Sequence, residues 1–143
     1  MEVVDRFERT VLEHVADRVR AQRLLDEARQ LLPAHTPTFT HADLGPAHVL
    51  CDDAGVTGII DWSDMAVADP AIDGAWLLNG SDGALRQPLL DRWNIDDGMV
   101  RRADLIRRLG PWWEVYYGLE QDRADLVVSG LAGVDARLPR DGR

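Results

Sequence analysis

The sequence predicts an α+β fold that is mostly helical, and three observations support this class. Apolar residues recur at three-to-four spacing in the first 32 residues and again from residue 70 to residue 138, which is the periodicity of amphipathic helices. Short β-like runs with turn residues lie between these two regions. No internal repeat or low-complexity linker divides the 143 residues, so we expect a single domain, residues 1–143.

Residues 1–35 predict a helical lead-in of two helices. The first spans Val3 to Val19, with apolar residues on one face and charged residues among them. The second carries its apolar stripe from Ala21 to Leu32. It is expected to end at Pro33, because the proline ring removes a backbone donor and restricts the preceding residue.

Residues 36–69 predict a catalytic loop and a hairpin, with short strands at residues 38–40, 48–51 and 56–60. The sequence Asp52-Asp53-Ala54-Gly55 consists of turn residues, so the last two strands are expected to form the hairpin. Cys51 lies in an apolar run and is the only cysteine, so it cannot form an internal disulfide. We expect it to be a small buried side chain in a reducing compartment.

Residues 70–138 predict a helical subdomain, and the tail 139–143 is expected to fray. Asp69 and Pro70 suit the cap and first position of a helix over residues 71–78. A break at Gly110-Pro111 is expected to separate two later helices. The expected helices after the first cover residues 84–93, 99–109, 112–119 and 126–138.

Charge and hydropathy exclude several classes of partner. Twenty-five acidic and sixteen basic residues give a net charge of −9, which repels a phosphate backbone and excludes nucleic acid. The same charge would attract a cationic small molecule, although an acidic surface is also typical of a merely soluble protein. No apolar run reaches the roughly 20 residues that cross a bilayer, and the charged first residues do not fit a secretion signal. We expect a cytoplasmic protein with no membrane partner.

Two carboxylates follow neighbouring β-like runs, eighteen positions apart. Asp43 lies in a loop that begins with His41, and Asp61 follows an apolar run. Phosphoryl transfer needs one carboxylate to orient the attacking hydroxyl and accept its proton, and another to hold the metal ion that bridges the phosphates. A lone His-x-Asp is also typical of an ordinary loop. The ordered series of strand, loop, hairpin, Asp61 and Asp69-Pro70 is far more specific than that motif.

The segment from Pro37 to Leu78 resembles the catalytic loop and metal-binding segment of the aminoglycoside phosphotransferase family, which are small-molecule kinases with a protein-kinase-like fold. The resemblance implies a protein-kinase-like C-terminal lobe whose small hairpin carries the catalytic and metal-binding loops. It implies that Asp43 is the catalytic base, that His41 helps to fix the loop, and that Asp61 binds Mg²⁺.

One position departs from the family pattern. The family usually has asparagine as a second metal ligand five residues after the base, and this chain has His48 there. Mg²⁺ prefers oxygen ligands, whereas imidazole suits softer ions. We therefore expect His48 either to contact the metal ion through a water molecule or to form part of a site that admits Mn²⁺. The alternative is a histidine that begins a strand and has a satisfied ring nitrogen.

Acidic and aromatic side chains are the candidates for binding the acceptor substrate, because carboxylates suit amines and aromatic faces suit sugar or macrolide rings. Helix capping and backbone hydrogen bonding are alternatives for the two aspartates, and core packing is the alternative for the aromatic residues. The candidates are Asp64, Asp73, Trp113, Glu114 and Tyr117.

The nucleotide-binding half of such a kinase is not recognisable. No glycine-rich phosphate loop precedes His41, and all sixteen basic residues are arginines, so no lysine can grip phosphates. We expect the C-terminal lobe only, as an excised fragment, a truncated gene product or a degenerate relative. ATP or GTP would bind only if a nucleotide lobe is supplied, and the lobe alone is expected to be inactive because positioning supplies most of the rate.

Three functions follow from these residues. The first is the catalytic lobe of a kinase that, when complete, phosphorylates a hydroxyl of an aminoglycoside, a macrolide or a similar molecule, as in antibiotic resistance. The second is a non-catalytic module that captures a cationic small molecule. The third is a truncated remnant that forms a homodimer through the apolar face exposed by the missing lobe.

Overall fold

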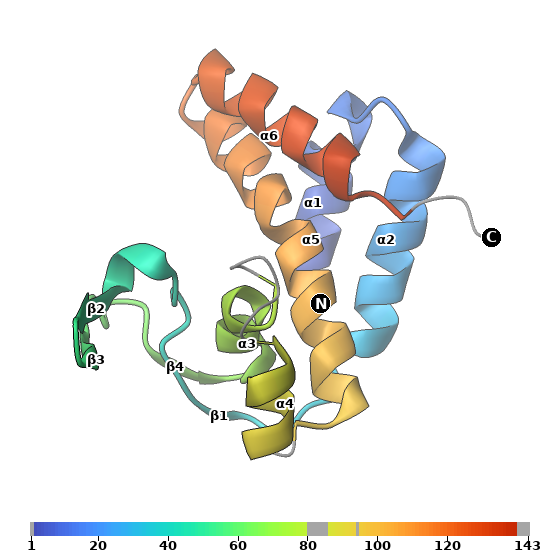
Figure 1. The fold of residues 1–143 in the computed structure, drawn as a ribbon. Helices are drawn as coiled ribbons and strands as arrows, with labels where there is room; N and C mark the ends of the chain where they lie inside the picture. Colours follow the sequence, from blue (N-terminus) through green and yellow to red (C-terminus); the bar gives the residue numbers. More distant parts are fainter. Residues whose placement is uncertain (1, 80–85, 94, 140–143) are drawn as a thin grey trace. The chain divides into compact units, whose positions relative to one another are not determined.

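The computed structural model describes residues 2–79, 86–93 and 95–139 (Figure 1). The chain divides into two compact units, one made of residues 1–34 and 108–143 and the other of residues 35–107. Helices predominate and the strands form two small sheets, which confirms the predicted α+β class. The predicted division of one domain into lead-in, catalytic segment, helical subdomain and tail stays a prediction, and residues 140–143 lie outside the described residues.

The first unit contains α1 (Glu2–Thr10), the 3₁₀ turn η1 (Leu12–His14), α2 (Arg18–Leu31), the second half of α5 (Asp97–Glu120) and α6 (Ala124–Arg137). The prediction of one helix from Val3 to Val19 is wrong, because α1 ends at Thr10. The Asp17 side chain caps the next helix by accepting from the Arg20 N–H at 3.0 Å. Val11 and Val15 stay buried on either side of the break, so the apolar spacing alone does not reveal it.

Helix α5 continues through Pro111, so the predicted break at Gly110-Pro111 is wrong. In Figure 1, α6 runs beside this part of α5, and glycines on α6 allow the close approach. A Cβ atom added at Gly133 would lie 2.9 Å from Cβ of Pro111, and one added at Gly130 would lie 2.7 Å from Cγ2 of Val115. This packing stabilises a helix that a proline would otherwise interrupt.

The aromatic run on α5 divides between core and surface. Trp112 is fully buried, and its ring lies 5.8 Å from that of Phe7. Trp113 and Tyr117 are exposed. The largest fully buried side chains of this unit are Trp112, Phe7, Leu24, Leu25, Val4, Val11, Val115 and Val134.

The second unit contains both sheets. The hairpin of β2 (Val49–Asp52) and β3 (Gly55–Ile59) is confirmed: Asp52 Oδ1 accepts from the Ala54 N–H at 2.8 Å, and Gly55 has φ +128°. The second sheet pairs β1 (Thr38–Thr40) with β4 (Ala66–Ala68), a three-residue strand that the sequence did not predict. The 3₁₀ turn η2 (Pro46–His48) precedes β2. Cys51 is exposed rather than buried, because its hairpin exposes most of its side chains.

Helices α3 (Ala71–Leu77) and α4 (Arg86–Trp93) join the first half of α5 in this unit, which confirms the helix expected after Asp69-Pro70. A buried ion pair ties α3 to α5: Arg102 Nε donates to Asp69 Oδ2 at 2.7 Å, and Asp69 Oδ1 accepts from the Ala71 N–H at 3.0 Å. The helices expected over residues 71–78 and 84–93 imply a break between them, and residues 80–85 lie outside the described residues. The small core around these helices consists of Ala71, Leu78 and Ala103 with Leu89, Leu90, Ile95, Met99, Val100 and Ile106.

Candidate active site

The loop after β1 carries Asp43 and is held by a carboxylate on α3. The His41 N–H donates to Asp73 Oδ2 and the Ala42 N–H donates to Asp73 Oδ1, both at 2.9 Å. Ala42 has φ +68°, a left-handed conformation that costs a non-glycine residue about 1–2 kcal/mol. The two hydrogen bonds to Asp73 therefore fix a strained turn, and Asp43 follows it with an exposed side chain.

The His41 ring links this loop to the end of β3. Its Nδ1 accepts from the Asp43 N–H at 3.3 Å, so the proton of the neutral ring lies on Nε2, which donates to the Ile60 carbonyl at 2.9 Å. The ring is buried and lies 4.7 Å from that of Trp62, whose Nε1 donates to the Ile59 carbonyl. The buried histidine thus connects the loop of Asp43 to the loop that carries Asp61.

His48 lies between the two predicted carboxylates. Its Nδ1 donates to the Asp43 carbonyl at 2.7 Å and lies 3.7 Å from Asp43 Oδ2. Its Nε2 lies 3.9 Å from Asp61 Oδ2. The backbone N–H of Ile60 also donates to the His48 carbonyl at 3.0 Å. Asp43 and Asp61 therefore converge on one imidazole ring, although eighteen residues separate them in the sequence.

Asp61 is an exposed carboxylate whose pKa is lowered by its neighbours. The Ser63 hydroxyl donates to Asp61 Oδ1 at 2.8 Å. This hydrogen bond is the main cause that lowers the pKa of the Asp61 carboxyl, and the nearby His48 and His41 rings lower it further. The backbone of Asp61 has φ +60°. The sequence analysis missed Ser63; a serine two residues after an aspartate, a spacing at which a hydroxyl can reach a neighbouring side chain or backbone group, was the available signal.

His48 and Asp61 could supply two ligands to a metal ion whose remaining ligands come from phosphates and waters. Because Nδ1 carries a proton, the lone pair of the neutral ring lies on Nε2 and faces Asp61 Oδ2. Within the described residues, no group of three or more His, Cys, Asp or Glu side chains forms a metal cage. Mg²⁺ in nucleotide enzymes is usually held by one or two protein carboxylates plus phosphates and waters. One carboxylate and one imidazole nitrogen are consistent with such a partial site.

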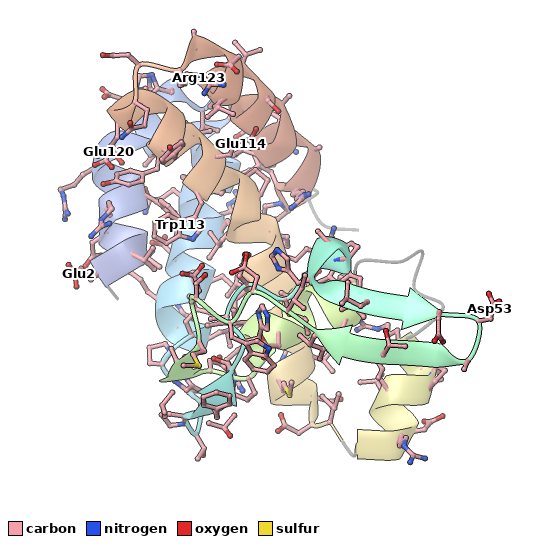
Figure 2. The ribbon with its side chains drawn as sticks, turned by 90° about the vertical axis from the view of Figure 1, so that its left-hand side faces the viewer. Glu2, Asp53, Trp113, Glu114, Glu120 and Arg123 are labelled. Carbon is pink, nitrogen blue, oxygen red and sulfur yellow. The ribbon has the colours of Figure 1, made fainter. Side chains whose placement is uncertain are left out.

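The predicted substrate-binding residues lie in different surroundings. Asp64 is exposed in the turn after Asp61, whereas both oxygens of Asp73 accept from the loop backbone, which matches the backbone-bonding alternative. Trp113, Glu114 and Tyr117 lie on α5 in the first unit, while Asp43 and Asp61 belong to the second. Figure 2 labels Trp113 and Glu114 on that helix, and Asp53 at the hairpin tip.

The sequence of the chain matches a known family. Residues 3–117 match the family described as "Phosphotransferase enzyme family". The chain belongs to this family. Over 122 residues it is 30% identical to viomycin phosphotransferase of Streptomyces vinaceus, a match that covers 81% of this chain and 42% of that protein. The predicted resemblance to aminoglycoside phosphotransferases is thereby confirmed at the level of the family.

Solved structures of phosphotransferases share the fold. The GDP complex of wild-type aminoglycoside 2'-phosphotransferase-IIIa matches with a TM-score of 0.79 and 23% identity, over 94% of this chain and 49% of that one. The apoenzyme of macrolide 2'-phosphotransferase MphH from Brachybacterium faecium matches with a TM-score of 0.70 and 23% identity, over 98% and 47%. This chain thus spans about half the length of the relatives it matches.

No helix in the described part of this family member has the length and hydropathy that a membrane crossing requires.

Proposed function

We propose that this chain provides the catalytic base and the metal-binding loop of a kinase that transfers the γ-phosphoryl group of ATP or GTP to a hydroxyl of a small molecule. The observation that carries the proposal is the convergence of Asp43 and Asp61 on His48, at 3.7 Å and 3.9 Å from its two ring nitrogens. This spacing leaves room for an acceptor hydroxyl at one carboxylate and a divalent ion at the other.

Asp43 orients the acceptor hydroxyl and accepts its proton. Its side chain is exposed, and its backbone is fixed from both sides, since its N–H donates to His41 and its carbonyl accepts from His48. His41 and Asp73 act as positioning residues because they hold the loop rather than the substrate. We therefore assign Asp73 to the loop and keep Asp64 as a candidate contact to the substrate.

Asp61 Oδ2 and His48 Nε2 would hold Mg²⁺ or Mn²⁺. The ion, when bound with the nucleotide, neutralises charge that develops on the phosphates. The imidazole nitrogen in place of the usual amide oxygen favours Mn²⁺ over Mg²⁺, because nitrogen ligands suit transition metals better than Mg²⁺. The charged state of Asp61, which Ser63 stabilises, suits either ion.

The acceptor is a polar molecule with a hydroxyl group, and the names of the relatives support its class. Viomycin, kanamycin, gentamicin and macrolides appear in the names of the matched phosphotransferases or their complexes. The net charge of −9 favours a cationic member of this set. Phosphorylating such an antibiotic in the cytoplasm would confer resistance. Trp113, Glu114 and Tyr117 stay predicted substrate-binding residues.

The nucleotide would bind only in the presence of additional polypeptide that supplies the phosphate-binding residues. The chain has no lysine and spans about half of each matched phosphotransferase. We therefore expect the 143 residues alone to show little transfer activity, because base and metal ligand without nucleotide positioning provide a small part of the rate.

Manganese titration followed by electron paramagnetic resonance tests the metal assignment. Asp61→Ala is expected to weaken Mn²⁺ binding by tenfold or more, since it removes the charged ligand. Asp53→Ala is the matched control, because Asp53 lies at the exposed hairpin tip (Figure 2) and its loss should leave the affinity unchanged. Equal Mn²⁺ affinity in the wild type and in Asp61→Ala would refute the site.

Calorimetry separates the kinase lobe from a non-catalytic binding module. A module that captures cationic molecules would bind kanamycin with the same affinity in the presence and absence of Mn²⁺ and GTP.

Dimerisation of a truncated remnant also stays a prediction, and sedimentation at several concentrations tests it. A homodimer would show a molecular mass that rises with concentration.

A further inference from the structure

A cluster of large apolar side chains lies open on the β1–β4 sheet. Phe39 of β1 and Val67 of β4 are direct partners in the antiparallel register, so they share one face, and they are 61% and 73% exposed. The Phe39 ring stacks on Trp62, with centroids 5.9 Å apart. We call these three residues the strand-pair face. Contiguous exposed apolar surface of this kind marks an interaction site more often than chance exposure of single residues does.

The sheet beneath this face presents backbone groups as well as side chains. Within the described residues, β1 and β4 pair only with each other, so each strand has an edge without a ladder partner. A two-stranded sheet is marginally stable alone, and an open edge pairs readily with another extended chain. Such an edge recognises polypeptide backbone, which a small molecule or a nucleic acid does not offer.

The chain segment that carries the face is acidic. The sequence contains no arginine or lysine between Arg29 and Arg86, but it contains eight aspartates there. Two of these, Asp61 and Asp64, flank Trp62 in the chain, and both are exposed. A partner that covers the face must therefore be apolar where it meets the rings and positively charged at the rim.

We propose that the strand-pair face docks a basic, extended polypeptide segment, which adds a strand to the β1–β4 sheet and places a lysine or arginine side chain against Asp64. A second copy of this chain is disfavoured, because each copy carries a charge of −9. The inference does not depend on phosphoryl transfer, since neither Phe39 nor Val67 belongs to the proposed catalytic machinery.

The test uses a synthetic eight-residue peptide that alternates valine and lysine, with binding followed by backbone amide chemical shifts. We expect shifts at Phe39 and Val67 and an affinity that falls as salt rises, since part of the attraction is electrostatic. Val67→Thr should weaken binding by up to about fivefold, because it keeps a β-branched side chain but loses apolar contact. Val128→Thr on α6 is the matched control, since Val128 is 69% exposed in the other unit.

Asp64→Asn provides a second variant that does not touch the apolar contact, and it should reduce both the affinity and the salt dependence. A peptide that alternates valine and glutamate should not bind. The inference is wrong if the lysine peptide fails to bind, if the glutamate peptide binds equally well, or if Val67→Thr and Val128→Thr have the same effect. It is also wrong if sedimentation shows a dimer that Val67→Thr abolishes, because the occupant is then a second copy. Unchanged Mn²⁺ affinity in Val67→Thr keeps this test separate from the metal site.

Discussion

Replacing Asp73 with asparagine should release the loop that carries the proposed base. In the wild type, the two oxygens of Asp73 accept from the N–H groups of His41 and Ala42, each at 2.9 Å. Asparagine offers one oxygen and directs an NH₂ group at the second N–H, so one hydrogen bond is lost and the other loses its charge assistance. Hydrogen bonds to charged groups contribute roughly 1.5–3 kcal/mol.

The expected loss is about 2–4 kcal/mol in the free energy of opening the loop, because one charge-assisted bond disappears and one weakens. The left-handed backbone of Ala42, with φ +68°, adds to the tendency to open once its anchor is gone. Native-state hydrogen exchange measures this quantity directly. The amides of His41 and Ala42 should exchange between about 30-fold and several hundredfold faster than in the wild type.

Asp64→Asn is the control for the loss of a negative charge, because Asp64 is exposed in a turn of the same unit. It should leave the exchange of the His41 and Ala42 amides unchanged. Wild-type exchange rates in Asp73→Asn would refute the anchoring role. Equal acceleration in Asp64→Asn would show that charge, and not the pair of hydrogen bonds, governs the loop.

Two further substitutions test the electrostatics of the same unit. Ser63→Ala should raise the pKa of the Asp61 carboxyl toward its ordinary value of 3.8, and NMR titration measures this change. In the wild type, the Ser63 hydrogen bond stabilises the folded state fully above pH 3.8. This stabilisation is lost as the pH falls through the lowered pKa that Asp61 has in the folded protein. An unchanged titration midpoint would contradict the assignment. Arg102→Met should lower the free energy of unfolding by roughly 3–5 kcal/mol in urea denaturation, because it leaves the buried Asp69 carboxylate without its arginine partner. Arg101→Met, on the adjacent exposed arginine, should cost much less, and equal costs would argue against a stabilising role for the buried pair.

Local patterns in the sequence determined the elements that depend on neighbouring residues. The helix that ends before Pro33, the hairpin around Asp52 to Gly55 and the helix after Asp69-Pro70 were all predictable, because caps, turns and prolines act within a few residues. The sequence also singled out Asp43 and Asp61, which the fold brings near one imidazole ring, while their catalytic and metal-binding roles stay predictions.

The tertiary structure decided what depends on residues far apart in the chain. Helix α5 passes through Pro111 because Gly130 and Gly133 of α6 pack against it, and no pattern near the proline indicates that. Asp73 anchors a loop more than 30 residues earlier. The convergence of two carboxylates on His48 likewise needs the β-hairpin to return the chain to the loop. Sequence periodicity reports which face of an element is apolar, but only packing determines which elements and side chains meet across that face.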